Sequence, residues 1–407
     1  MKVAVIGGGW AGIAAAVELT AAGTETTLFE AGRALGGRAR SVDIAGRTLD
    51  NGQHILLGAY RETLALMRRV GADPGRLLDR RPLCVVDASG FRLALPRLPA
   101  PLNVAWGLLA ARHVGLREKL ATARWMHGVK ARGFVLPADT TVAAWLDGAG
   151  QTGVLRRRLW EPLCLAALNT PAERASAQIF ANVLRDSLGS PRRADTDLLL
   201  PRAPLGKLLP EPATDWLTAN SATLRTGTRV RTLVAGADAI AVDGEDFAAA
   251  VLATAPQHAA RLWPGTVPAL EHEPIATVYL QFRPETALPF PLFSQAGNGG
   301  QWVVDRSNGL LACVLSGHGD WEAFADDDLA ALMAAELALP SPVLWHTVVR
   351  ERRATFSCRP DLPRAGCTTA CPRLFLAGDH TWAEYPGTLE GAVRSGRRAA
   401  HELLAKR

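Results

Sequence analysis

The fold is decided by ten residues near the start of the chain, VAVIGGGWAG at positions 3–12. The first four are apolar and mostly β-branched, which is typical of a strand buried on both faces. Glycines follow at positions 7, 9 and 12 in the spacing G-x-G-x-x-G, and residues 11–22 predict a helix that Gly23 ends. A strand, a glycine-rich turn and a helix in this order indicate a Rossmann-type nucleotide-binding fold.

Each glycine of this turn has its own physical purpose. Gly7 permits the tight turn, Gly9 lets the backbone approach a diphosphate where a Cβ would clash, and Gly12 lets the helix pack closely on the strand. We place Trp10 and Ala11 in the same cofactor site. The reason is that the free N–H groups and the dipole at the start of a helix bind phosphate charge.

An acidic residue completes this signature. A second strand-like run, residues 26–29, ends in Glu30, which lies eighteen residues after Gly12 and is placed to accept hydrogen bonds from ribose hydroxyls. An acid at this position disfavours a 2′-phosphate, so NADP is not expected. A glycine-rich turn without a ligand is the alternative, and the complete order of strand, glycines, helix, strand and acid speaks against it. NAD and FAD share this fingerprint.

The residues that follow favour FAD. The stretch LGGR at 35–38 resembles the second glycine motif of the amine oxidase and phytoene desaturase superfamily. The resemblance implies that the backbone at Gly36 and Gly37 passes beneath the diphosphate of FAD, that Arg38 balances its charge, and that Arg40 assists. A turn with surface arginines is the alternative, which the tandem arrangement of two glycine motifs weakens.

A segment near the end of the chain resembles the closing FAD motif of the same superfamily. Residues 374–379, LFLAGD, predict a buried strand that ends in Gly378 and Asp379, and GTLEGAV at 387–393 opens a helix. The resemblance implies that Asp379 hydrogen-bonds the ribityl chain and that the helix start at Leu389 faces the N1–C2=O edge of the flavin. A turn or N-cap aspartate is the alternative for Asp379.

The FAD-related pieces lie near the start, middle and end of the chain, so a discontinuous domain is expected. In the middle piece, Val230 resembles the superfamily valine whose backbone meets the adenine. Because 407 residues exceed one ordinary core, the sequence predicts an α/β fold with a Rossmann-type FAD-binding domain and a mixed α+β substrate domain. We assign residues 1–88, 205–265 and 365–407 to the FAD-binding domain and residues 89–204 and 266–364 to the substrate domain. Within the latter, periodicity predicts helices at 102–111, 117–129, 154–168 and 179–188, and sheet at 276–282 and 310–315.

The charge and the cysteines narrow the protein class. The net charge is +6, but the basic residues are scattered rather than striped along one helix, so no nucleic acid partner is expected. An arginine-rich composition explains this charge most simply, and attraction to anionic lipids is the second explanation. Six cysteines show no CxxC pair and no zinc spacing, which predicts a reducing compartment and no metal site. The first residues form a strand rather than a signal peptide, so a cytoplasmic location is expected.

One apolar segment leaves a membrane contact open. Residues 99–111, PAPLNVAWGLLAA, are led by prolines and followed by Arg112 and His113. They fit either a buried helix of the substrate domain or a monotopic patch that dips into a membrane beside a lipid tunnel. No run of about 20 uninterrupted apolar residues is present, so no helix is expected to span a bilayer. A peripheral contact with the inner face of the cell membrane therefore stays open.

Three stretches give a narrower resemblance. DNGQHILLGAY at 50–60, WEPLCLAALNTP at 160–171 and YPGTLEGA at 385–392 together resemble the squalene-associated FAD-dependent desaturase family, the hydroxysqualene dehydroxylases of bacterial hopanoid biosynthesis. The resemblance implies reductive removal of the allylic hydroxyl from hydroxysqualene, a long apolar isoprenoid, to give squalene. The protonated hydroxyl leaves as water, and reduced flavin delivers hydride from N5 to the allylic cation. The protein supplies an apolar tunnel, a proton donor and alignment. The resemblance names no electron donor.

The proton donor is chosen among three residues. His54 is the first candidate, because superfamily topology puts residues 52–54 near the flavin ring and an imidazole titrates close to neutrality. Glu384 and Tyr385 are second choices, since they precede the helix that faces the flavin. The alternatives are a histidine bonded to nearby backbone and a solvated loop acid.

Three other functions stay open at this point. A phytoene-type desaturase would run in the opposite redox direction on a similar substrate, and the flavin does the hard chemistry in both. In amine oxidases an aromatic residue stands before the Leu-Glu-Gly of the closing helix, whereas this chain has Thr388, which disfavours an amine oxidase. A carrier that binds flavin or lipid without turnover is the third.

Overall fold

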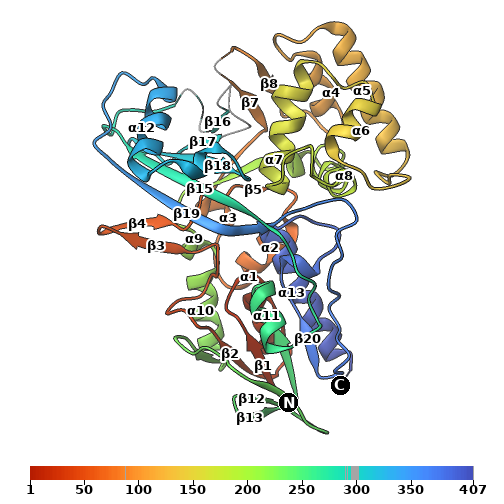
Figure 1. The fold of residues 1–407 in the computed structure, drawn as a ribbon, viewed down its shortest axis with the longest axis vertical. Helices are drawn as coiled ribbons and strands as arrows, with labels where there is room; N and C mark the ends of the chain where they lie inside the picture. Colours follow the sequence, from red (N-terminus) through yellow and green to blue (C-terminus); the bar gives the residue numbers. More distant parts are fainter. Residues whose placement is uncertain (88, 289, 291, 295–301, 407) are drawn as a thin grey trace.

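The computed structural model describes residues 1–87, 89–288, 290, 292–294 and 302–406 of the chain. The described chain is elongated (Figure 1). A parallel sheet lies at the end that holds both termini, and an antiparallel sheet with a group of helices lies at the other end. The site described below lies between the two sheets.

The parallel sheet has five strands in the order β10-β2-β1-β14-β20. The first strand pairs with β2 on one side and with β14 on the other, and four of its five residues are buried. Strands from the start, middle and end of the chain thus lie side by side, which confirms the predicted Rossmann-type fold. The strands are β1 (Lys2–Ile6), β2 (Glu25–Phe29), β10 (Thr223–Arg225), β14 (Ala249–Leu252) and β20 (Leu374–Leu376).

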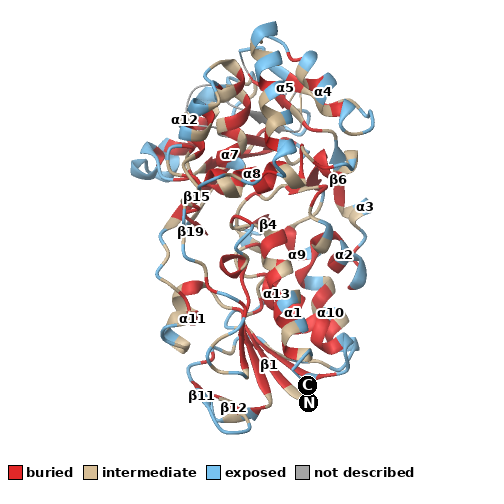
Figure 2. Cartoon of the chain, turned by 90° about the vertical axis from the view of Figure 1, so that its right-hand side faces the viewer, coloured by how far each residue is buried: buried red, intermediate tan, exposed pale blue. Residues whose placement is uncertain are grey.

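Helices cover one face of this sheet (Figure 2). The helix predicted after the first glycine motif is α1 (Trp10–Ala21), and α13 (Leu389–Leu404) packs against it. The two backbones approach closely at Gly396, where an added Cβ would lie 2.0 Å from the carbonyl oxygen of Ala11. This layer also contains α2 (Arg61–Arg69) and α10 (Pro210–Ala219).

The opposite face carries a small antiparallel meander and one short helix. Phe29 and Phe247 meet there edge to face, with their ring centroids 5.9 Å apart. Ile6, Leu252 and Leu376 of the parallel sheet join the same apolar cluster. The elements are β11 (Leu233–Ala235), β12 (Ile240–Val242), β13 (Glu245–Phe247) and α11 (Pro256–Leu262).

The antiparallel sheet has the strand order β16-β17-β18-β15-β19. Its two longest strands, β15 and β19, pair with each other and run toward the parallel sheet (Figure 1). The predicted sheet at 276–282 and 310–315 is confirmed by β15 and β18. Helix α12 (Asp326–Leu337) packs on one face of this sheet. The strands are β15 (His272–Gln281), β16 (Leu292–Ser294), β17 (Trp302–Asp305), β18 (Leu310–Ser316) and β19 (Trp345–Phe356).

A group of helices completes this end of the molecule. The four helices predicted in the first insert are confirmed, and α6 lies between the second and third of them. Trp160 and Phe180 from this group share a buried core with Tyr279 and Trp302 of the antiparallel sheet. The helices are α4 (Leu102–Leu109), α5 (Leu116–Ala131), α6 (Val142–Gly148), α7 (Glu161–Leu168), which continues a π-helical turn (Arg156–Trp160), and α8 (Ala177–Asp186).

Short elements join the two ends. Strand β9 pairs with β5 and with β6, so residues near 200 lie beside residues near 57 and 80. The elements are β3 (Ser41–Ile44), β4 (Arg47–Asp50), β5 (Leu56–Leu57), α3 (Pro74–Leu77), β6 (Leu78–Arg81), β7 (Cys84–Val86), β8 (Arg92–Ala94), β9 (Leu198–Pro201) and α9 (Leu205–Leu208). The predicted domain boundaries remain a proposal. Within the described part of the chain, strand pairs cross them at two places: β9 of the substrate domain pairs with β5 and β6 of the FAD-binding domain, and β7 of the FAD-binding domain pairs with β8 of the substrate domain.

Candidate functional site

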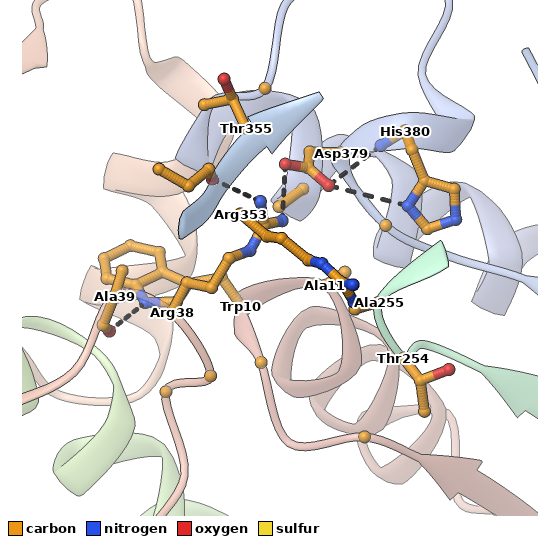
Figure 3. A pocket seen from close by; sticks show the side chains of 18 of the residues that line it. Trp10, Ala11, Arg38, Ala39, Thr254, Ala255, Arg353, Thr355, Asp379 and His380 are labelled. Carbon is orange, nitrogen blue, oxygen red and sulfur yellow. Dashed lines mark hydrogen bonds and ion pairs between the residues drawn. The ribbon is translucent and has the colours of Figure 1, made fainter. Parts of the chain in front are cut away.

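A cavity of about 800 Å³ lies between the two sheets (Figure 3). Its floor is formed where β1, β2, β14 and β20 end, which is the crevice where open parallel sheets bind ligands. Its other wall comes from β19, β15 and α7, which contribute Thr355, Ile275 and Ala166. The site therefore takes residues from both ends of the elongated molecule.

The predicted cofactor residues converge on this cavity. Gly12 stands apart, because it lies behind the lining, where an added Cβ would be 1.8 Å from the carbonyl oxygen of Gly7. The lining includes Gly7, Gly9, Trp10, Ala11, Glu30, Gly36, Gly37, Arg38, Val230, Gly378, Asp379 and Leu389.

The two glycine motifs form one continuous backbone surface. Gly36 donates its N–H to the carbonyl oxygen of Gly8 at 2.8 Å, and Gly9 and Gly36 form a parallel bridge. A Cβ added at Gly9 would meet only the Cα of Gly37, 3.9 Å away, because the rest of the space is cavity. This bare surface at the start of α1 fits a diphosphate, which needs close backbone approach and N–H donors.

Glu30 holds two loops at the edge of this surface. Its carboxylate accepts hydrogen bonds from the N–H groups of Gly8 and Gly32, both at 2.6 Å. The same carboxylate lines the cavity, and buried Val230 lies on the wall nearby. An acid and an apolar backbone segment at this end of the crevice fit the ribose and adenine of a dinucleotide.

Arg38 and Asp379 form an ion pair across the cavity floor. The Arg38 Nη2 atom lies 2.7 Å from Asp379 Oδ2, and Nη1 of Arg38 donates to the carbonyl oxygen of Ala354. Burial by itself would raise the pKa of Asp379, but the guanidinium of Arg38 and the imidazole of His380 hold that pKa far below its usual range. The backbone N–H of His380 also donates to Oδ1 at 3.0 Å. Asp379 is therefore a carboxylate that can accept hydrogen bonds from a ligand.

Positive charge exceeds negative charge in the lining. Arg353 of β19 points toward Ala11 and Ala255 at the floor (Figure 3). Burial lowers the pKa of His258, and so do the neighbouring guanidinium groups of Arg261, Arg229 and Arg353. The surplus amounts to two positive charges, which matches the two negative charges of a diphosphate. The five lining arginines are Arg38, Arg229, Arg231, Arg261 and Arg353, and the three lining carboxylates are Glu30, Glu351 and Asp379.

His54 reaches the cavity from the loop after β4. Its Nδ1 atom lies 2.9 Å from the carbonyl oxygen of Gly52, so Nε2 is the ring nitrogen that this carbonyl does not engage. Burial lowers the pKa of His54 below 6.5; the Gly52 carbonyl and Asp50 act in the opposite direction, and Arg38 adds to the lowering. The backbone contact weighed as an alternative is thus present, and the same ring lines the cavity.

Glu384 and Tyr385 are not among the described residues that line the cavity. Glu384 is exposed, and its Oε2 atom lies 3.4 Å from Nη2 of Arg185. Tyr385 is buried; it donates its hydroxyl hydrogen to Asp186, and the guanidinium of Arg394 lies 4.7 Å from its ring centroid. The structure brings His54 to the cavity and leaves these two residues outside it.

Tyr60 and Arg353 were missed at the sequence level. Tyr60 lines the cavity near Leu389, and burial and the nearby Glu390 raise the pKa of its hydroxyl, which therefore keeps its proton. Tyr60 is the last residue of the 50–60 stretch. Its separation of six residues from His54 did not indicate that both side chains would face the same cavity. Arg353 ends a run of four charged residues at 350–353, and the sequence gave no sign of which of them would face the cavity.

The stretch at 160–171 connects the cavity to the helices. Ala166, Ala167 and Asn169 line the cavity. Asn169 has a left-handed backbone with φ of 49°, donates from Nδ2 to Thr355 Oγ1 at 3.1 Å, and accepts at Oδ1 from the Gly317 N–H at 2.8 Å. The end of α7 is therefore fixed to the antiparallel sheet at the cavity wall.

Comparisons with known proteins agree with this geometry. The family model for flavin containing amine oxidoreductases matches residues 10–404. Hydroxysqualene dehydroxylase of Rhodopseudomonas palustris is 32% identical over 99% of this chain and 98% of its own length, and that of Sinorhizobium fredii is 30% identical over 100% and 99%. A solved putrescine oxidase with bound putrescine superposes with a TM-score of 0.70 at 18% identity, covering 100% of this chain and 99% of that one, which shows a shared fold.

Proposed function

The chain belongs to the flavin-containing amine oxidoreductase family, among the hydroxysqualene dehydroxylases, and we propose that it removes the allylic hydroxyl of hydroxysqualene reductively to give squalene. The observation that carries the proposal is the lining of one cavity. The 50–60 and 160–171 stretches, which resemble this family most closely, face the same space as the nucleotide-binding residues. The reaction would supply squalene for hopanoid biosynthesis.

FAD is the cofactor, and the lining residues fit each part of it. The glycine surface with Arg38 and Arg353 would hold the diphosphate, Glu30 the ribose, and Asp379 the ribityl chain. The start of α13 would face the flavin ring. When bound and reduced, FAD supplies the electron pair that replaces the lost hydroxyl.

In this proposal His54 is the general acid that donates the proton to the leaving hydroxyl. A hydroxyl is a poor leaving group until it is protonated, and it then departs as water. His54 would hold the proton at Nε2, because the Gly52 carbonyl engages Nδ1. Ala166, Ala167 and Ile275 give the cavity an apolar wall that suits a hydrocarbon chain and limits the access of water to an allylic cation.

The test is conversion of hydroxysqualene by purified protein with reduced FAD, followed by mass spectrometry. We expect squalene in amounts that exceed the enzyme, and no product from putrescine, which serves as a control for amine oxidation. Protein that holds FAD but forms no squalene would contradict the proposal. Dehydrogenation of a polyene with oxidised FAD would identify a desaturase instead.

We also propose that the enzyme works at a membrane surface, because its substrate is a lipid. Helix α4 exposes Leu102 (58%), Trp106 (55%) and Leu109 (55%), and α5 adds Leu116 (62%) and Leu120 (56%). Both helices lie at the end of the molecule opposite the termini (Figure 1). Exposed apolar side chains in this number are typical of a helix that lies in the bilayer interface.

Exposed arginines flank this apolar surface along the chain, before and after α4 and on α5. Within the described part of the chain, no carboxylate forms an ion pair with Arg97, Arg112, Arg117 or Arg124. Unpaired arginines beside exposed leucines and a tryptophan suit a leaflet that carries anionic headgroups. In the same described part, no helix combines the length and apolar character needed to cross a bilayer.

A further inference from the structure

The loop that carries His54 is held by the antiparallel sheet on the far side of the cavity. The N–H of Gln53 donates to Thr277 Oγ1 at 3.2 Å, and the hydroxyl of Tyr279 donates to the carbonyl oxygen of Asp50 at 3.0 Å. Thr277 and Tyr279 lie two residues apart on β15 and therefore point to the same face of the sheet. The sheet thus contacts the loop on both sides of Gly52, at Asp50 and at Gln53.

A third contact comes from Arg306, just after β17. Its Nη1 atom lies 3.0 Å from Asp50 Oδ2 and 2.9 Å from Gln53 Oε1. The side chain of Arg306 is 12% exposed and that of Asp50 is fully buried. Asp50 Oδ1 also accepts the N–H of Leu205 at 2.7 Å. One guanidinium nitrogen therefore ties together the two residues that bracket Asn51 and Gly52.

We propose that Arg306 is a positioning residue that holds the imidazole of His54 in the cavity. The proposal rests on the proposed role of His54 as proton donor. Gly52 gives the loop backbone freedom, and the imidazole of His54 is bonded to the carbonyl of that same glycine. Movement of the loop would therefore move the ring, and Arg306 prevents such movement at both ends.

Arg306 also sets the charge near the imidazole. The charged groups that act on His54 are Asp50, which raises its pKa, and Arg38, which lowers it. The ion pair with Arg306 offsets the negative charge of Asp50. Loss of Arg306 would leave that carboxylate without its cation, favour the imidazolium, and extend activity to higher pH.

The first experiment compares three variants in squalene formation. Arg306→Met should lower kcat about tenfold or more with little change in KM, because displacement of a catalytic group slows the chemical step. The pH at which this variant loses activity should be higher than that of the unmodified enzyme. Arg306→Lys, which keeps a cation for Asp50, should recover most of the rate. Arg283→Met changes an exposed arginine two residues after β15 and should behave as the unmodified enzyme. An unchanged kcat and pH profile in Arg306→Met would overturn the proposal.

A double-mutant cycle with His54→Gln tests whether Arg306 acts through the imidazole. If it does, Arg306→Met should cost little further activity in the His54→Gln background. Independent, multiplicative losses would overturn the proposal. If Arg306→Met does not fold, Gln53→Leu removes one of the two contacts and leaves the Asp50 ion pair intact, and the same cycle applies.

A measurement without turnover separates this proposal from the proposed function. The imidazole of His54 can be titrated by NMR in the FAD-bound protein, and Arg306→Met should raise its pKa. An unchanged His54 titration would count against Arg306 whatever the activity. Absence of squalene from the unmodified enzyme would instead count against the proposed function.

Discussion

Gly9 is a residue at which a single added side chain would enter the space proposed for the cofactor. Its Cβ position opens into the cavity, so Gly9→Val should place two methyl groups where the diphosphate must lie. The purified variant should therefore be colourless, as measured by flavin absorbance per protein. Gly148→Val is the control, since that glycine is exposed on α6 and a Cβ added there would meet no other part of the protein within 4 Å. Normal FAD content in Gly9→Val would contradict the assignment.

Arg353 and Arg352 form a matched pair on β19. Arg353 lines the cavity, whereas Arg352 does not, although both are exposed and lie where the pairing of β19 with β15 shifts register. Arg353→Gln should weaken FAD binding to the apoprotein about tenfold, which is the order expected for a charge-assisted contact to phosphate. Arg352→Gln should leave the Kd unchanged. Riboflavin, which has no phosphate, should bind both variants alike, and equal losses of FAD affinity would refute the assignment.

The protonation of His54 predicts a pH dependence. Burial lowers the pKa of His54 below 6.5, and the reaction consumes the proton of the imidazolium. The population of imidazolium falls as pH rises through that pKa, so kcat should fall in the same direction. His54→Gln should lower kcat about 100-fold or more and remove this limb of the profile. A wild-type rate that rises with pH across this range would exclude His54 as the acid.

The sequence predicted those residues whose type is required by the backbone or by a cofactor. Gly9, Arg38 and Asp379 stand in motifs with fixed spacing, and these motifs placed them in one site before any fold was known. Tyr60 and Arg306 do not stand at a position that such a motif requires. Their roles depend on side-chain direction and on contacts between segments far apart in the chain, which spacing does not report. Glu384 is the reverse case, because it lies next to a motif and yet is not among the described residues that line the cavity.

At the scale of elements, Glu390 joins two helices. Its carboxylate accepts the N–H groups of Glu62 (3.2 Å) and Thr63 (2.9 Å) at the start of α2, and Nε of Arg394 donates to it at 2.8 Å. The buried acid of the Leu-Glu-Gly motif therefore caps the start of another helix, while Thr388 Oγ1 accepts the Gly391 N–H and caps α13 itself.

Glu390→Gln should destabilise the protein more than it affects chemistry. Loss of the Glu390 carboxylate weakens buried charge-assisted hydrogen bonds, which should lower the free energy of unfolding by about 1–3 kcal/mol. Thermal and denaturant unfolding of the FAD-bound protein measure this change. Glu402→Gln on the same helix is the control, and a loss of stability as large as that of Glu390→Gln would contradict the capping role.

The elements themselves were predicted more completely than their contacts. Strands β1 and β20 and helices α1 and α13 follow from apolar runs and glycine positions. Helix α6 is short, seven residues, and its apolar face merges with the surrounding core, so periodicity gave little signal there. The segment 99–111 gave a helix, but which face of it would be exposed depended on the packing of α5 and could not be read from composition.

For the whole molecule, the exposed surface of α4 and α5 predicts binding to lipid vesicles. The double variant Leu102→Ser, Trp106→Ser removes two exposed apolar side chains and should weaken binding to vesicles that contain phosphatidylglycerol about tenfold or more. Co-sedimentation measures the bound fraction, and added salt should weaken binding further. Val234→Ser, Leu344→Ser is the control, because these residues are equally exposed elsewhere, at 60% and 59%. Unaltered sedimentation of the first variant would rule out this surface.

The interleaving of the parallel sheet has a consequence for biosynthesis. Strand β20, Asp379 and α13 are made after the other strands of this sheet, yet β20 pairs with β14, which pairs with β1. A nascent chain on the ribosome therefore lacks one edge of the crevice until residues 374–404 emerge. The coenzyme is therefore captured only after this segment has been made, and a protein clipped before residue 374 would lose its colour.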